Sequence, residues 1–188
     1  MLPGVRNTID PASCVLVLVD YQQRLMPAIH GGDAALAEAL LLADAARELG
    51  IPVVGTEQNP AGLGPNVEAI RARCETTLAK MHFDACAEEL SSCLADRPAP
   101  PTDVVVAGCE AHVCLMQTSL GLLRAGLRVW VAANACGSRR PQDHEIAMQR
   151  LRQAGAVIVT SEMVVFEWLH TCRHERFKAV LELLKARP

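Results

Sequence analysis

Five short runs of apolar and β-branched residues recur along the chain, separated by longer stretches of mixed character. The runs are CVLVLVD from Cys14, IPVVGTE from Ile51, DVVVAG from Asp103, RVWVAA from Arg128 and AVIVTSE from Ala156. Continuous apolar strands of this kind are typical of a parallel sheet that is covered on both faces. The pattern therefore predicts five buried strands.

Between these runs the apolar positions follow the spacing of amphipathic helices. The helical stretches are DAALAEALLLADAARELG (33–50), DACAEELSSCLAD (84–96), HVCLMQTSLGLLRAG (112–126) and QDHEIAMQRLRQAG (142–155). Three of them close on a glycine, at Gly50, Gly126 and Gly155. Glycine just past a helix is a capping signal, because it tolerates the left-handed conformation needed there.

The alternation of strand and helix predicts an α/β protein with one domain over residues 1–188. Its expected architecture is a three-layer α/β/α sandwich around a doubly wound, mostly parallel sheet of five to six strands. Ligands of such sheets bind at the carboxyl ends of the strands. That edge selects as candidates Asp20, Thr56, Glu57, the segment 108–114 and Asn134.

Composition and charge narrow the classes of partner. The 188 residues carry a formal net charge of -3 with scattered basic residues, so we expect no nucleic-acid partner and no anionic membrane surface. No apolar run approaches the roughly 18 residues that span a bilayer. The first residues, MLPGVRNTIDPAS, lack the pattern of a signal peptide, which predicts a cytoplasmic protein without a membrane partner.

The cysteines and histidines do not show the spacing of a metal site. The eight cysteines never form C-x-x-C, and no pair is matched by two histidines at zinc-finger spacing. Cys14, Cys109 and Cys136 lie in or beside apolar strand-like runs. The sequence therefore predicts reduced thiols, no metal and no cofactor.

Asp20 and Lys80 are two residues that could belong to one site. Asp20 directly follows the first apolar run, where its carboxylate could act as a general base or cap the YQQRLM segment that follows. Lys80, in TLAKMHFDAC, lies just before a predicted helix. It is either a solvated surface group or a partly buried ammonium that stabilises a nearby thiolate and carboxylate.

Cys114 follows the strand from Asp103 and its turn at Gly108, in the opening turn of the next predicted helix. Unpaired amides and the helix dipole at such a place favour the thiolate and lower the pKa of a thiol. The backbone amides of Glu110 and Cys114 could also converge on a carbonyl oxygen as an oxyanion hole. The alternative is a buried structural thiol, for which Cys109 is the better candidate because it is closer to the strand.

Three stretches, taken in this order, resemble the isochorismatase-like cysteine hydrolases, a family that includes nicotinamidases and carbamoylases. VLVLVDYQQRLMPAI (15–29) resembles the first-strand motif with its aspartate, and KMHFDAC (80–86) resembles the lysine motif. VVVAGCEAHVCLMQTSLGLLRAGLRVWVAANACGSR (104–139) resembles the nucleophile motif and its following strand. With TEQNPAGLGP (56–65), the resemblance covers nearly the whole chain and points to the isochorismatase domain-containing subgroup.

The resemblance implies a Rossmann-like isochorismatase-like hydrolase fold and an enzyme that cleaves the C–N bond of a small amide, ureide or carbamoyl compound. Cys114 would attack the carbonyl carbon and form a thioester, Asp20 would carry the proton, and Lys80 would hold thiolate and carboxylate in register. A non-proline cis peptide is also implied between Cys109 and Glu110. Loop side chains would enclose the substrate; the candidates are Tyr21, Leu25, Leu63, His82 and Leu115.

Departures from the family pattern limit the activity. Nicotinamidases carry an Asp-x-His-type metal site after the second strand, whereas GTEQNPAGLGP (55–65) supplies no histidine, so we expect neither a metal nor nicotinamidase activity. Isochorismatases proper lack the cysteine, and Cys114 therefore argues against their vinyl-ether reaction. Asn134 stands where many relatives have aspartate and is interpreted as a hydrogen-bonding group at a strand end.

Two other functional classes remain open. In a redox protein, Cys109 would resolve an oxidised Cys114, although a disulfide needs Cα atoms within about 7 Å. A non-catalytic scaffold would keep the fold without turnover.

The tail EMVVFEWLHTCRHERFKAVLELLKAR (162–187) is helical by pattern and more apolar than a terminal helix needs. Packing on a second subunit would use that surface, which predicts a homo-oligomer.

Overall fold

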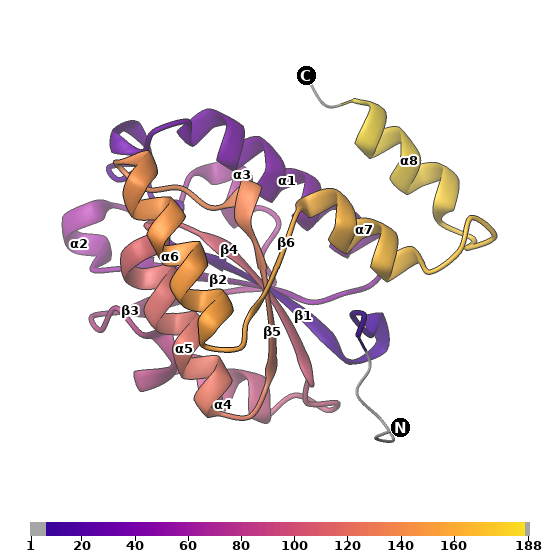
Figure 1. The fold of residues 1–188 in the computed structure, drawn as a ribbon, viewed down its shortest axis with the longest axis horizontal. Coiled ribbons are helices and arrows are strands. Elements are labelled where there is room, and N and C mark those ends of the chain that lie inside the picture. The colour runs from indigo at the N-terminus through magenta and orange to yellow at the C-terminus, as the bar shows by residue number, and fades with distance from the viewer. Residues whose placement is uncertain (1–6, 187–188) are drawn as a thin grey trace.

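One parallel sheet organises the protein in the computed structural model, which describes residues 7–186 (Figure 1). Its strands are β1 (Cys14–Val19), β2 (Val53–Gln58), β3 (Thr76–Lys80), β4 (Asp103–Gly108), β5 (Arg128–Ala132) and β6 (Val157–Val159). The order across the sheet is β3-β2-β1-β4-β5-β6, and every neighbouring pair is parallel. The predicted α/β class and doubly wound sheet are confirmed.

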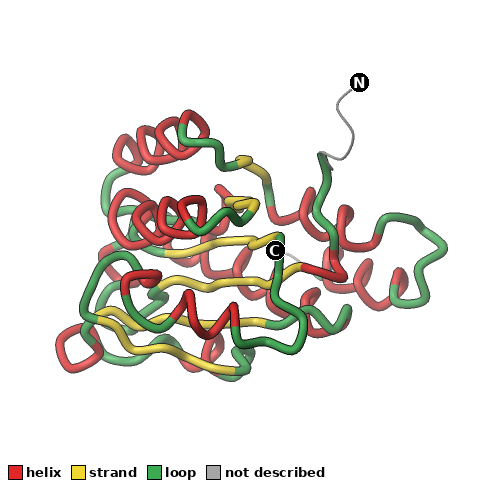
Figure 2. Tube along the Cα trace, turned by 90° about the horizontal axis from the view of Figure 1, so that it is seen from below, coloured by secondary structure: helices red, strands yellow, loops and turns green. Residues whose placement is uncertain are grey.

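Helices connect the strands and lie on both sides of the sheet (Figure 2). They are α1 (Gly32–Glu48), α2 (Pro60–Leu63), α3 (Glu68–Arg71), α4 (Leu90–Ala95), α5 (Met116–Arg124), α6 (Pro141–Gln153), α7 (Ser161–Leu169) and α8 (Phe177–Lys185). A π-helical turn, Ala111–Leu115, precedes α5. Buried residues of α1, α7 and α8 pack in one core, and those of α4, α5 and α6 pack in a second.

The central strand β1 contributes to both cores. Leu16 and Leu18 join the core with α1 and α7, whereas Val15, Val17 and Val19 join the core with α5 and α6. Successive side chains of a strand point to opposite faces, so a strand covered on both sides is apolar at every position. This explains the continuous apolar run of β1.

The edge strand β3 has no counterpart among the five predicted runs. Its sequence is TTLAK, in which Lys80 alone is buried and the other positions are partly buried or exposed. A strand at the edge of a sheet has one strand neighbour and more contact with solvent, so it need not be continuously apolar. Lys80 was expected just before a helix. The structure corrects this position, because Lys80 is the last residue of the strand β3.

The tail pattern folds as two helices. α7 ends at Leu169, and His170, with a φ of 56°, separates it from the segment that leads to α8. Val180 of α8 is fully buried, and Phe177 and Leu184 pack against the core shared with α1. Part of the apolar surface of the tail is thus covered within the chain, whereas Phe166 of α7 is 43% exposed, and packing on a second subunit stays a prediction. Arg187, at the end of the tail pattern, lies outside the described residues.

The glycines predicted to follow three of the helices are confirmed at those positions. Gly50, Gly126 and Gly155 follow α1, α5 and α6 with positive φ values of 70°, 82° and 103°. Trp130 and Trp168 are buried in the core with α1 and α7. Within residues 7–186, no helix combines the length and apolar character that crossing a membrane requires. Residues 1–6, part of the stretch without a signal-peptide pattern, lie outside the described range.

Candidate active site

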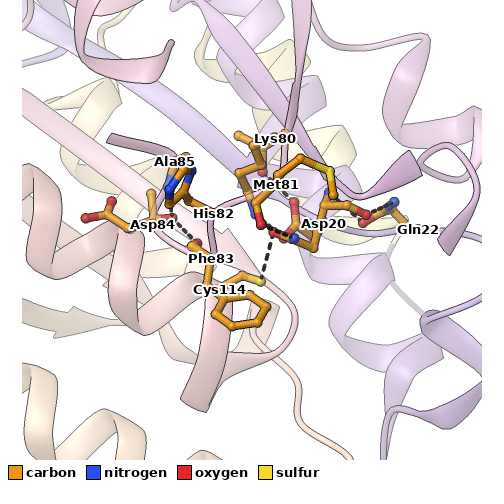
Figure 3. A network of polar contacts seen from close by, with 12 residues as sticks. Asp20, Gln22, Lys80, Met81, His82, Phe83, Asp84, Ala85 and Cys114 are labelled. Atoms are coloured by element: carbon orange, nitrogen blue, oxygen red, sulfur yellow. Dashed lines mark hydrogen bonds and ion pairs between the residues drawn. The ribbon is translucent and has the colours of Figure 1, made fainter. Parts of the chain in front are cut away.

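The carboxyl ends of four neighbouring strands bring the candidate side chains together. Asp20 follows β1, Gln58 ends β2 and Lys80 ends β3, while Cys114 lies in the π-helical turn after β4. Figure 3 shows the side chains of Asp20, Lys80 and Cys114 gathered at this edge. The sheet order β3-β2-β1-β4 makes these strand ends adjacent although they are far apart in sequence.

The Asp20 carboxylate is fully buried and held on both of its oxygens. Thr56 Oγ1 donates to Asp20 Oδ1 at 2.7 Å, and Lys80 Nζ donates to Asp20 Oδ2 at 2.8 Å. Asp20 has a φ of 55°, a left-handed conformation that aspartate tolerates better than most residues. Its backbone N–H still donates to Thr56 O at 3.2 Å, which continues the pairing of β1 with β2.

Lys80 is 3% exposed, which excludes the solvated surface setting. Its ammonium forms a buried ion pair with Asp20 and donates a second hydrogen bond to Gln58 Oε1 at 2.8 Å. Taking both charges out of water is costly, and close pairing with additional hydrogen bonds offsets that cost. The ion pair therefore keeps a carboxylate and an ammonium inside the protein at the strand ends.

The Cys114 thiol lies beside this pair and is 6% exposed. Burial, with a further contribution from the Asp20 carboxylate, raises the pKa of the thiol to about 12, although the Lys80 ammonium acts in the opposite direction. The surrounding turn is π-helical, with Leu115 N donating to Glu110 O at 3.3 Å. The sequence predicted a thiol with a lowered pKa in the first turn of an α-helix. That expectation is corrected, because the turn is π-helical and the raised pKa keeps the resting thiol protonated.

Gln58 is a site residue that the sequence analysis did not single out. Its Oε1 accepts hydrogen bonds from Lys80 Nζ and, at 3.9 Å, from Cys114 Sγ. The expected strand from Ile51 stopped one residue earlier, at Glu57. A polar residue next to Thr56 and Glu57 at a carboxyl strand end was the available signal, but the sequence does not show which of the three faces the site.

The turn after β4 approaches β1 closely. A Cβ atom at Gly108 would lie 2.3 Å from Val19 O, so only glycine fits there. The peptide bond between Cys109 and Glu110 is cis. The Glu110 carboxylate accepts hydrogen bonds from Arg139 Nε at 2.9 Å and from the Arg139 backbone N–H at 3.1 Å. These contacts hold Glu110 next to the π-helical turn that carries Cys114.

The sulfurs of Cys109 and Cys114 lie in different surroundings. Cys109 is fully buried in the core with α1 and α7, whereas Cys114 packs in the core with α5 and α6. Both are free thiols. Cys109 thus occupies the structural position expected for it.

The residues expected to enclose a substrate divide into two groups. Tyr21 and Leu115 are fully buried, and the Tyr21 hydroxyl donates to Ala135 O, so their contact with a substrate stays a prediction. Leu25 and Leu63 are partly exposed, and His82 is exposed. These three remain candidates for substrate contact.

The loop after Lys80 is tied down by Glu88. Glu88 Oε1 accepts from the backbone N–H groups of Met81 and His82 at 2.8 and 2.7 Å, and it lies 2.8 Å from His82 Nδ1. These hydrogen bonds, chiefly the one from the His82 backbone, lower the pKa of Glu88 to about 2. The loop beside the site is therefore held by an anion at neutral pH.

Asn134 has the strand-end role predicted for it. Its Oδ1 accepts hydrogen bonds from Ser161 N at 2.9 Å and from Ser161 Oγ at 3.2 Å. It thereby joins the segment after β5 to the start of α7.

Residues 7–186 contain no group of three or more His, Cys, Asp or Glu side chains placed to hold a metal ion.

Comparisons with known proteins match most of the chain. A family model described as the isochorismatase domain matches residues 14–163. Mouse isochorismatase domain-containing protein 2A is 33% identical over 180 residues, which cover 94% of this chain and 85% of the mouse protein. Zebrafish isochorismatase domain-containing protein 1 is 35% identical over 95% of this chain, and the match spans 63% of that longer relative.

Solved structures share the same fold. The MAR1 ribonuclease of Caenorhabditis elegans has a TM-score of 0.89 and 33% identity, over 96% of this chain and 94% of that one. The YcaC protein of Escherichia coli has a TM-score of 0.88 over 100% of this chain and 93% of that one, but at 23% identity it supports the fold alone. With a matched domain over most of its length and relatives above 30% identity, the chain belongs to the isochorismatase family.

Proposed function

We propose that this protein is a cysteine-dependent hydrolase acting on the C–N bond of a small amide, ureide or carbamoyl compound. The observation that carries the proposal is a buried thiol, Cys114, that shares the acceptor Gln58 Oε1 with Lys80, the ammonium of the buried ion pair with Asp20. A buried ion pair adds little net stability by itself. Next to a thiol, however, its carboxylate can act as a base and its ammonium can stabilise a thiolate.

In the first step, Cys114 Sγ attacks the carbonyl carbon of the substrate while Asp20 takes the thiol proton. The raised pKa of Cys114 keeps the resting thiol protonated, so proton transfer accompanies bond formation. The electron pair of the C=O bond moves onto oxygen, where the backbone amides of Glu110 and Cys114 would hold the negative charge. The Lys80 ammonium stabilises the charge that develops on sulfur.

In the second step, the oxyanion collapses and the C–N bond breaks as Asp20 returns its proton to the leaving nitrogen. A thioester on Cys114 remains. Water then attacks this thioester and gives a proton to Asp20, and the S–C bond breaks with Lys80 stabilising the departing sulfur. Asp20 returns the proton to sulfur, which restores the enzyme. The steps use side chains and backbone amides of this chain together with one water molecule.

A small substrate fits the site better than a polymer does. The C. elegans relative is described as a ribonuclease. Cys114 is 6% exposed, and the chain has a formal net charge of -3, whereas binding to RNA relies on basic surface for its phosphates. The redox alternative is also less well supported, because Cys109 and Cys114 pack in different cores.

Intact-mass spectrometry tests the proposal with a panel of amides, ureides and esters. At least one compound is expected to leave an acyl adduct on Cys114 and to be hydrolysed, and Cys114→Ala should abolish both. The control variant is Cys172→Ala, since Cys172 is an exposed free thiol that should not matter. Hydrolysis that survives in Cys114→Ala would contradict the proposal. A short RNA in the same panel, if cleaved by both wild type and Cys114→Ala, would favour a ribonuclease.

We also propose that the protein is a cytoplasmic homo-oligomer. Met163 and Phe166 of α7 are 49% and 43% exposed, and large apolar side chains at a surface favour association. The E. coli protein is described as an octameric hydrolase, but its likeness supports the fold alone. Sedimentation velocity should show a multimer that Met163→Glu with Phe166→Glu dissociates, while Ile146→Glu on α6, also exposed, does not. A monomeric wild type would contradict this.

A further inference from the structure

The side-chain amide of Gln58 lies between Lys80 and Cys114. Its Oε1 accepts hydrogen bonds from Lys80 Nζ at 2.8 Å and from Cys114 Sγ at 3.9 Å, and its Nε2 donates to Met81 O at 2.7 Å. Gln58 is 7% exposed. One amide thus contacts the ammonium, the thiol and the loop that follows Lys80.

Chemistry fixes the orientation of this amide. An ammonium can only donate hydrogen bonds and a backbone carbonyl can only accept them. If the Gln58 amide were flipped, its NH₂ group would face the Lys80 ammonium and its oxygen would face Met81 O. Both contacts would become repulsive, so the acceptor atom must face the lysine and the thiol.

Gln22 braces the backbone of Gln58. Its Oε1 accepts from Gln58 N at 2.9 Å, and its Nε2 donates to Gln58 O at 3.0 Å and to Gly64 O at 2.6 Å. Gln22 is fully buried and lies two residues after Asp20. The end of β2 is therefore held by the same segment that carries the proposed base, and the position of the Gln58 side chain is determined relative to Asp20.

Resting on the proposed hydrolase function, we infer that Gln58 is a positioning residue that holds the Lys80 ammonium between Asp20 and Cys114. Lysine has three N–H donors. Asp20 Oδ2 and Gln58 Oε1 receive two of them, which leaves one to reach the sulfur. The amide oxygen accepts the thiol hydrogen bond but is too weak a base to take the proton. The proton therefore stays on sulfur until Asp20 removes it.

Replacing Gln58 by methionine keeps the length of the side chain and removes the acceptor. Lys80 is then held by Asp20 alone, and its stabilisation of the thiolate weakens. Loss of the long S–H···O contact acts in the opposite direction, but a hydrogen bond from a charged donor is the stronger of the two. We expect Cys114 to be alkylated about tenfold more slowly at a fixed pH below the midpoint, which is the change that a midpoint about one unit higher produces.

Gln58→Glu keeps the shape of the side chain and adds a negative charge. The charged groups that act on the thiol in the wild type are Asp20 and Lys80. A second carboxylate beside the sulfur opposes the thiolate, so the midpoint should rise further than in Gln58→Met. This variant also decides the matter if Gln58→Met does not fold.

The test is the rate of iodoacetamide labelling at Cys114 between about pH 7 and pH 9, where the rate for a protonated thiol reports a shift of its pH midpoint. The full-length protein is labelled, and peptide mass spectrometry identifies the labelled cysteine. Wild type, Gln58→Met, Gln58→Glu and Lys80→Met are compared, with Gln149→Met, an exposed glutamine of α6, as the matched control. Thermal unfolding by circular dichroism checks that each variant is folded. A residue needed only for packing would lower the melting temperature without moving the pH midpoint.

The outcomes separate this inference from the proposed function. Higher midpoints in both Gln58 variants, with Gln149→Met unchanged, support the positioning role. If Lys80→Met raises the midpoint but a folded Gln58 variant does not, the role of Gln58 is overturned and the hydrolase proposal stands. If Lys80→Met leaves the midpoint unchanged as well, Lys80 does not act on the thiol, and the proposed catalytic arrangement fails.

Discussion

Replacing Asp20 by asparagine is expected to abolish turnover and, at the same time, to make the Cys114 thiol easier to alkylate at neutral pH. Loss of a positioned general base should slow hydrolysis by roughly 10²- to 10⁴-fold. The carboxylate of Asp20 also contributes to the raised pKa of Cys114, while Lys80 lowers that pKa. Without the carboxylate, the ammonium is the remaining charge beside the sulfur, and a thiolate paired with it becomes more favourable.

Both effects can be measured on the same preparation. Iodoacetamide labelling at pH 7 reports the thiolate of Cys114, and hydrolysis of whichever panel compound acylates wild type reports turnover. Asp44→Asn is the matched control, because Asp44 forms a partly exposed ion pair with Arg73 away from the thiol. If Asp20→Asn labels more slowly than wild type, the carboxylate promotes alkylation by taking the thiol proton, and the expected gain in reactivity of Cys114 is contradicted.

Replacing Lys80 by methionine is expected to give the largest loss of stability. Lys80 and Asp20 pair at 2.8 Å with side chains that are 2% and 0% exposed. Removal of one partner leaves an uncompensated buried charge, which typically costs about 3–5 kcal/mol. Methionine has a similar volume, so the loss comes from the charge and not from a cavity.

Urea unfolding measures this loss. Arg73→Met is the control, because the pair of Arg73 with Asp44 has side chains 25% and 29% exposed and should contribute about 1 kcal/mol or less. The double variant Asp20→Asn with Lys80→Met removes both charges and should recover most of the stability lost in Lys80→Met. A double variant as unstable as Lys80→Met would show that the loss comes from packing around position 80.

Where the sequence analysis was incomplete, the cause lies in contacts between segments that are distant along the chain. β3 is missed because an edge strand of half-buried residues has no continuous apolar run. Gln58 is missed because it acts only through its contacts with Lys80 and Cys114, which come from other strands. Tyr21 looks like a loop residue next to Asp20, but its ring is buried and its hydroxyl donates to Ala135 O.

The sequence by itself determined the alternation of strand and helix and the sheet edge at which polar residues collect, because these features depend on local spacing and residue type. It also offered Asp20, Lys80 and Cys114 as candidates, and the resemblance to a known family grouped the three as one site. Only the tertiary structure decided the protonation of Cys114, because the pKa of a thiol depends on its burial and on the charges that surround it. Those charges come from β1 and β3, and only the folded sheet brings them to the sulfur.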